Sequence, residues 1–202
     1  MTSPIPLPLT VAVEGPSDVP VVRRILATAG LALGPVYGQS GKATINASIR
    51  AYNNAARHSP WFVLRDLDSD APCAPELAKR LLPEPAAWMR FRIAVREVEA
   101  WLLADTVGIA AYLGVPRGLV PVAPETLDDA KLALVNLARR SKKSAIRKDM
   151  VPYPGLSSVV GPGYVSRLGD FATGHWNIDA AADRCDSLRR CISAVAKLAD
   201  HF

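Results

Sequence analysis

Short apolar runs alternate along the chain with segments of helical spacing. Residues 9–13 form an apolar, β-branched run that ends at Glu14, which predicts a buried strand stopping at a turn. From Asp18 onward, with Pro20 in the first turn, apolar residues recur every three or four positions until Gly30, which predicts a helix. By the same criteria, further strands are expected at 35–37, 61–64 and 91–95, and further helices at 45–56, 76–82 and 97–103. This alternation predicts an α/β fold with a mostly parallel, Rossmann-like sheet covered by helices.

The second half of the chain is expected to be mainly helical. Residues 126–129 resemble a capping box that opens a helix leading into a basic run. A loop rich in Pro and Gly spans 151–163, and a last helix from about Asp179 carries an apolar stripe at helical spacing. A chain of 202 residues suits one domain. We therefore expect a single domain with a core at about 8–115 and helical and loop additions at about 116–202.

Composition narrows the class of protein further. Half of the residues are hydrophobic and a fifth are charged, which is typical of a globular chain rather than a disordered one. Cys73, Cys185 and Cys191 show no zinc-binding spacing, so we expect reduced core thiols. No secretory signal and no apolar stretch of membrane-spanning length is visible, which favours a cytoplasmic location and no membrane partner. The net charge of +5 favours an anionic partner.

Carboxylates follow three of the expected strands. They are Glu14 and Asp18 after the first strand, Asp66, Asp68 and Asp70 after the strand at 61–64, and Glu97 and Glu99 after the strand at 91–95. Because ligands in parallel sheets bind beyond the carboxyl ends of the strands, we expect these side chains to converge. Clustered carboxylates repel one another unless a cation is present, and hard oxygen ligands suit Mg²⁺ or Mn²⁺.

The sequence therefore predicts a metal site that performs phosphodiester chemistry. The expected metal ligands are Glu14, Asp18, Asp66, Asp68, Asp70 and Glu97. Among them Glu14, Asp66 and Asp68 are the expected catalytic residues, with both aspartates as ligands and Glu14 as a ligand or the general base for water. Metals held in this way activate a water and stabilise the leaving oxygen of an in-line displacement.

The same residues carry a resemblance to a known family. The segment Val13–Asp18, with the sequence VEGPSD, and the Asp66-Leu67-Asp68 tripeptide resemble the two signature motifs of the Toprim domain, which topoisomerases, DnaG primases and OLD nucleases share. Over nearly its whole length the chain resembles the small stand-alone bacterial Toprim-like proteins grouped as DUF4276, with further similar stretches at 96–105 and 161–164 and at Phe171 and Trp176. The resemblance implies a Toprim-like fold and a divalent-metal nuclease that acts with a separate ATPase in phage defence.

One feature of the family has no unique counterpart in the sequence. OLD nucleases add a catalytic lysine late in the domain, and four lysines compete for that position here, namely Lys131, Lys142, Lys143 and Lys148. The residue that would stabilise charge in the transition state is therefore left open.

Basic residues supply candidate contacts to nucleic acid, with DNA favoured. Lys42 lies in the glycine-containing segment GQSGKAT, which lacks the spacing of a Walker A loop but offers a phosphate contact. Arg139, Lys143 and Arg147 follow at intervals of four and would form one stripe if the helix continues, with Arg140 and Lys148 alongside. Lys142 belongs to the same basic run. A phosphate-backbone track and an ordinary solvated face both explain such a run.

Simpler interpretations stand beside the metal site. Asp18 suits a helix N-cap, and Asp66 to Asp70 suit a polar turn. Glu97 and Glu99 are two positions apart, so we expect at most one of them to point into the site, and both suit a solvated first helical turn. The alternative functions are a small-molecule phosphatase or phosphotransferase and a non-catalytic nucleic-acid-binding subunit of a defence or toxin system. The choice of DNA or RNA, the specificity, the partner and the oligomeric state stay open.

Overall fold

The computed structural model describes residues 7–201, and its centre is one parallel sheet. Four strands lie in the order β2-β1-β3-β4 and all run in the same direction. Their bounds are β1 (Pro8–Val13), β2 (Ala32–Gly38), β3 (Trp61–Asp66) and β4 (Met89–Ala94). The expected α/β, Rossmann-like fold is therefore confirmed, with β1 and β3 in the interior of the sheet and β2 and β4 at its edges.

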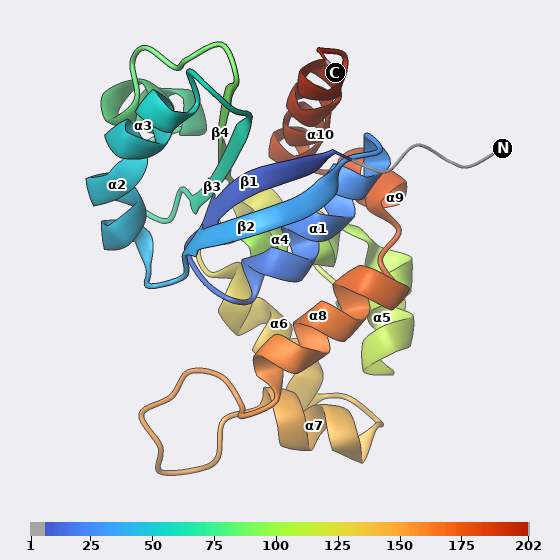
Figure 1. The fold of residues 1–202 in the computed structure, drawn as a ribbon. Helices are drawn as coiled ribbons and strands as arrows, with labels where there is room; N and C mark the ends of the chain where they lie inside the picture. The colour runs from blue at the N-terminus through green and yellow to red at the C-terminus, as the bar shows by residue number, and fades with distance from the viewer. Residues whose placement is uncertain (1–6, 202) are drawn as a thin grey trace, which may run out of the picture.

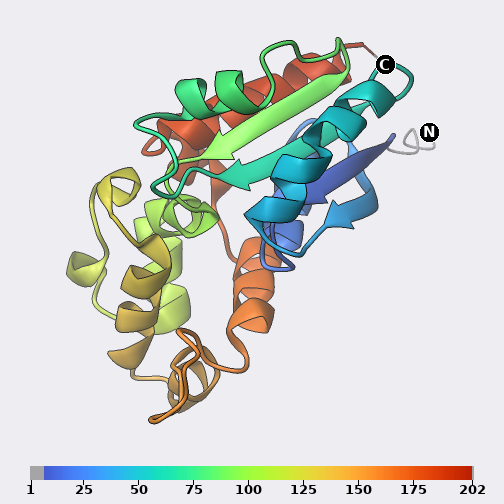
Figure 2. The same cartoon turned by 90° about the vertical axis from the view of Figure 1, so that its left-hand side faces the viewer.

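Helices cover both faces of this sheet (Figures 1 and 2). One face packs against α1 (Asp18–Thr28) and α10 (Asp186–Ala199), and the other against α2 (Lys42–Ala55) and α3 (Ala74–Leu81). The period of two in a strand explains the division, because Val11 and Val13 of β1 join the core beneath α1 whereas Ala12 joins the core beneath α2. Helix α10 belongs to the segment expected to be an addition, yet it completes the cover of the sheet.

Further helices lie beyond the carboxyl end of the sheet. Figure 2 shows the arrowheads of the strands pointing toward the light-green and yellow helices. The remaining helices are α4 (Val98–Ala104), α5 (Thr106–Leu113), α6 (Ala130–Arg139), α7 (Ser144–Met150), α8 (Tyr164–Gly174) and α9 (Ile178–Ala182), with 3₁₀ turns at Arg117–Leu119 and Pro124–Thr126. Of these, α4 to α6 have the light-green and yellow colours, whereas α8 is orange and packs against α1. The acidic ends of the strands are thereby enclosed between the sheet and a helical layer.

Several sequence predictions about helix ends were wrong. Asp129, not Thr126, is the N-cap of α6, because its carboxylate accepts a hydrogen bond from the Leu132 amide at 2.6 Å. Helix α6 ends at Arg139 and α7 begins at Ser144, so the basic run does not form one helical stripe. The last helix is likewise two helices, α9 and α10, and helices α5 and α8 were not predicted.

Three further observations concern the cysteines, Gly38 and the length of the helices. Cys185 and Cys191 are buried free thiols as expected, but Cys73 is exposed, so the prediction of a core thiol was wrong there. Gly38 has a φ of 82°, and a Cβ at this position would lie 2.3 Å from the Val13 carbonyl oxygen, so only glycine suits the end of β2. Within residues 7–201, no single helix has both the length and the apolar character needed to cross a bilayer.

Candidate active site

Glu14 and Asp66 meet at the carboxyl ends of the two interior strands. Glu14 directly follows β1, Asp66 is the last residue of β3, and the Asp66 amide donates a hydrogen bond to Glu14 Oε1 at 2.9 Å. The Asp66 carboxylate in turn accepts a hydrogen bond from the Val98 amide at 3.0 Å, at the start of α4. A chain of hydrogen bonds therefore fixes both carboxylates against β1, β3 and α4, as the convergence of parallel strand ends predicts.

Asp18 is the first residue of α1 and is almost fully buried. Its carboxylate accepts hydrogen bonds from the Gly15 amide at 2.9 Å and from Ser17 Oγ at 3.2 Å. The N-cap position belongs to Ser17, so the interpretation of Asp18 as the N-cap was wrong. Asp18 instead closes the turn that follows Glu14, and its charge is near enough to raise the pKa of Asp66.

Glu97 and Glu99 both contact Lys131, which extends from α6. Lys131 Nζ lies 3.3 Å from Glu97 Oε1 and 3.4 Å from Glu99 Oε1, and the Tyr164 hydroxyl donates to Glu99 Oε1 at 3.1 Å. Glu99 is only 2% exposed, so the interpretation as a solvated helical turn was wrong for it. Glu99 was not among the predicted site residues, although a lone carboxylate inside the apolar segment 98–104 was the available signal.

Burial and mutual repulsion raise the pKa values of these carboxylates. Burial raises the pKa of Glu14 to about 7, even though the Asp66 amide and the Arg65 guanidinium both favour the charged form. The pKa of Asp66 is raised well above its ordinary value, first by burial and then by the charges of Asp18, Glu99 and Glu14. Asp18 and Glu99 also have raised pKa values, with burial as the main cause. The four acids therefore form one electrostatically coupled cluster.

Lys131 is the cation of this cluster. Burial lowers its pKa, but the charges of Glu99, Glu97 and Asp66 outweigh burial and raise the pKa above its ordinary value. Of the four lysines that competed for a catalytic position, Lys131 is the one placed beside the acids. Lys143, by contrast, donates to the backbone carbonyls of Ala111 and Tyr112 at 3.0 and 2.8 Å.

Asp68 and Asp70 form ion pairs with two neighbouring cations. Lys42 Nζ lies 2.9 Å from Asp68 Oδ2 and 3.0 Å from Asp70 Oδ1, and the buried guanidinium of Arg65 also pairs with Asp70. Asp68 has a φ of 48°, a left-handed conformation that Asp tolerates better than most residues. Hydrogen bonds from Arg65 and Lys42 lower the pKa of Asp70. Lys42 therefore lies beside the carboxyl end of β3, where a phosphate contact was expected.

The predicted metal ligands are thus divided among three groups. Glu14 and Asp18 are near enough to Asp66 for their charges to raise its pKa, Asp68 and Asp70 pair with Lys42, and Glu97 pairs with Lys131. Among residues 7–201, no three His, Cys, Asp or Glu side chains come together in an arrangement ready to hold a metal ion.

The basic run at 139–148 lies away from the acids. Figure 1 places α7 at the end of the molecule opposite α3. Arg147 donates to the Ser141 carbonyl and Lys143 is held by α5, so two of the predicted nucleic-acid contacts are bound to backbone oxygens. Arg139, Lys142 and Lys148 are exposed.

Comparison with known proteins gave no match to a family model, to a curated protein or to a solved structure. The function therefore has to be argued from the site itself.

Proposed function

We propose that this protein is a divalent-metal-dependent nuclease whose active site is the buried cluster of Glu14, Asp18 and Asp66. The observation that carries the proposal is the meeting of these carboxylates at the carboxyl ends of β1 and β3, with raised pKa values. Buried acids that repel one another cost stability unless a cation joins them. A cluster of this kind at a ligand-binding edge of the sheet is better explained by function than by folding.

The donor atoms fit a hard divalent cation. Glu14 Oε2 and Asp66 Oδ2 accept no hydrogen bond from the described residues, so each carboxylate keeps a free oxygen. Mg²⁺ or Mn²⁺ prefers such oxygens and keeps several waters of its own, so it does not require a complete protein cage. When bound, the metal would activate a water and neutralise charge on a phosphodiester. Glu14, with its pKa near 7, suits the role of general base.

The neighbouring cations suit a phosphate substrate. Lys131, held by Glu97 and Glu99, is our candidate for stabilising negative charge that develops in the reaction. Lys42 is the candidate contact for a flanking phosphate, and Asp68, which pairs with Lys42, would be a further oxygen ligand for the metal. This assignment gives the late catalytic lysine of the resembling nucleases a counterpart at Lys131.

The resemblance to Toprim proteins supports the same proposal. Its acidic motif residues Glu14, Asp18 and Asp66 occupy the end of β1, the start of α1 and the end of β3. By this resemblance we also propose a separate ATPase as partner in phage defence. DNA as the substrate and a cytoplasmic setting are part of the same proposal.

A second candidate is a nucleic-acid-binding subunit without catalytic activity. It is favoured by the ion pairs that Lys131 already makes with Glu97 and Glu99 and by the lack of a preformed three-ligand cluster among residues 7–201.

The two candidates are separated by a cleavage assay. The full chain is incubated with supercoiled plasmid, linear DNA and RNA in Mg²⁺, in Mn²⁺ and in EDTA, together with Asp66→Asn, Glu14→Gln and the exposed control Glu76→Gln. We expect metal-dependent cleavage that Asp66→Asn and Glu14→Gln lose by about a hundredfold or more and that the control retains. Binding without cleavage would favour the subunit, and turnover of a small phosphate ester without cleavage of nucleic acid would favour a phosphatase.

A further inference from the structure

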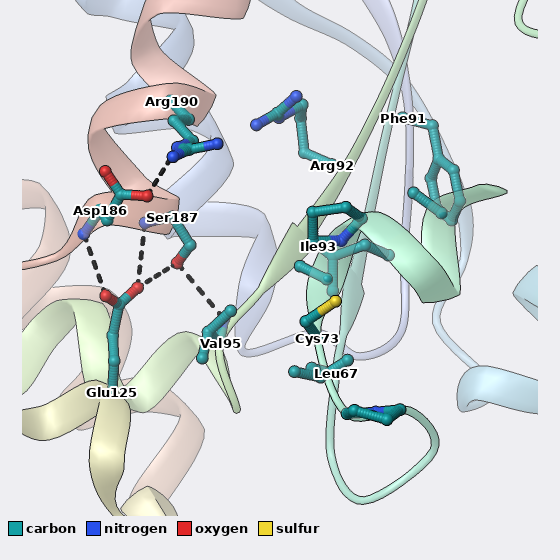
Figure 3. A pocket seen from close by; sticks show the side chains of 14 residues that line it. Leu67, Cys73, Phe91, Arg92, Ile93, Val95, Glu125, Asp186, Ser187 and Arg190 are labelled. Carbon is teal, nitrogen blue, oxygen red and sulfur yellow. Dashed lines mark hydrogen bonds and ion pairs between the residues drawn. The ribbon is translucent and has the colours of Figure 1, made fainter.

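A pocket of about 430 Å³ opens at the outer edge of β4 (Figure 3). It lies between the first turn of α3 and the N-terminal part of α10. Side chains alternate along the strand, so Phe91 and Ile93 face α3 while Arg92 faces α10. The volume falls in the range of small-ligand sites. The pocket thus has an apolar side and a basic side, separated by the strand edge.

Arg92, in the wall of this pocket, is a cation for which residues 7–201 supply no partner. Its Nε is buried without a hydrogen-bond partner, and no carboxylate of the described residues pairs with its guanidinium. A half-buried guanidinium loses hydration, and that cost is normally offset by a paired anion. The position therefore suits a ligand that brings negative charge.

Arg190 of α10 lines the same end of the pocket. Figure 3 shows the guanidinium groups of Arg92 and Arg190 at that end, and both residues also line the adjoining cleft between β4 and α10. Arg90, Arg189 and Lys197 line the same cleft, and its lining contains no acidic residue from the described part of the chain. Like charges held near one another favour an anion between them.

The two acidic residues of the pocket do not offset this charge. Glu125 accepts hydrogen bonds from the amides of Asp186 and Ser187 at 3.0 Å each and so caps α10. Asp186 already pairs with Arg189 and, at 2.6 Å, with Arg190 Nε. Only Nε of Arg190 is engaged in that pair, which leaves its terminal amino groups for a ligand.

We propose that this pocket binds a nucleotide, with its phosphate between Arg92 and Arg190 and its base against Phe91 and Ile93. Guanidinium groups bind phosphate through paired hydrogen bonds, and an aromatic ring beside an apolar wall supports a stacked base. The ligand is either a free nucleotide or the terminal nucleotide of a strand, because both present the same phosphate and base. The site lies outside the carboxylate cluster and requires no metal.

Cys73 provides a direct reporter of occupancy. It lines the pocket and is exposed, whereas Cys185 and Cys191 are buried, so a thiol reagent reaches Cys73 first in the native protein. The rate of Cys73 modification is measured in EDTA with nucleoside 5′-monophosphates, with a 5′-phosphorylated dinucleotide and with inorganic phosphate, and affinities are measured by calorimetry. We expect nucleotides at millimolar concentration to slow the modification. Stronger protection by the monophosphates would identify a free nucleotide as the ligand, and stronger protection by the phosphorylated dinucleotide would identify the end of a strand.

Variants test the two halves of the pocket separately. Arg92→Gln and Arg190→Gln should each weaken nucleotide binding about tenfold or more, since each removes a charge-assisted hydrogen bond. Arg50→Gln, an exposed residue of α2, changes the net charge equally and should leave the affinity unchanged. Phe91→Leu should weaken nucleotides but not inorganic phosphate. Thermal unfolding of each variant confirms that it is folded.

Three results of these pocket assays would overturn the proposal. In the first, no nucleotide protects Cys73. In the second, Arg92→Gln and Arg50→Gln bind nucleotides with equal affinity. In the third, inorganic phosphate protects Cys73 as strongly as nucleotides do. Asp66→Asn separates this site from the carboxylate cluster, because it should keep nucleotide binding even if the nuclease assay fails. Loss of binding in Asp66→Asn would place the ligand at the cluster and refute the pocket.

Discussion

The charge on Glu14 should destabilise the folded protein at neutral and higher pH when no divalent cation is present. Replacing Glu14 by Gln removes the charge but keeps an oxygen that accepts the hydrogen bond from the Asp66 amide. The change in the free energy of unfolding therefore reports the cost of ionising Glu14 and not the loss of this hydrogen bond. We expect Glu14→Gln to be more stable than the wild type at pH 8 and equally stable at pH 4.

The pKa of Glu14 sets the magnitude and the sign of this difference in stability. Burial raises this pKa from 4.5 to about 7, which corresponds to roughly 3 kcal/mol against the charged form. The partial exposure of the side chain reduces the expected effect to about 2 kcal/mol. Because the pKa is higher in the folded state than in the unfolded state, the cost is absent below pH 4.5, grows between pH 4.5 and 7 and is complete above pH 7.

The assay is urea unfolding of both proteins across this pH range in EDTA, with Glu76→Gln as the control for net charge. The stability difference between Glu14→Gln and wild type should rise through the stated window, and Mg²⁺ at pH 8 should reduce it by stabilising the wild type alone. A difference that does not change with pH would refute the assignment of the cost to ionisation. An equal effect of Mg²⁺ on both proteins would count against Glu14 as a metal ligand.

Three further substitutions test the surrounding contacts by urea unfolding. Lys131→Met should cost about 2 kcal/mol because Glu99 stays buried without its cation, and a loss equal at pH 4 and pH 8 would contradict this cause. Arg92→Met should raise the free energy of unfolding by about 1 kcal/mol, since it puts a methyl group in place of a buried Nε that has no partner among the described residues, and a destabilised variant would show that Arg92 has a structural role. Ser187→Ala should cost about 2 kcal/mol because the Trp101 indole N–H, which donates to Ser187 Oγ at 2.7 Å, loses its acceptor, and a neutral change would contradict that account.

The sheet and part of the site could be predicted because they depend on local patterns. Each strand is a short apolar run between turn residues, and a parallel order follows from the alternation with helices. Parallel neighbours place their carboxyl ends together, so Glu14 and Asp66 meet as expected. Asp18 follows Glu14 closely in the sequence, so the turn after β1 keeps both residues at the same end of the sheet.

Contacts that cross the fold could not be predicted in the same way. Every residue of α4 is buried, so the helical period gives no polar face from which to place Glu99. Lys131 reaches Glu97 from a helix more than thirty residues farther along the chain. The helix break after Arg139 contains neither Gly nor Pro, and the turn at Ser141 is held instead by a hydrogen bond from its hydroxyl to the Leu113 carbonyl. Such breaks arise from tertiary hydrogen bonds rather than from local propensity.

The basic residues that are free to bind an anion in the structure are not the ones that the sequence predicted. A run of basic residues at 139–148 suggested a phosphate track, but a sequence does not show which cations are already bound to backbone oxygens, as Lys143 and Arg147 are. Five basic residues that are scattered in the sequence instead line one cleft between β4 and α10, namely Arg90, Arg92, Arg189, Arg190 and Lys197. An anion approaching this face meets a cation without a partner at Arg92 and no carboxylate in the cleft lining. The salt dependence of any association with nucleic acid should therefore decrease more in Arg92→Gln than in Lys143→Gln.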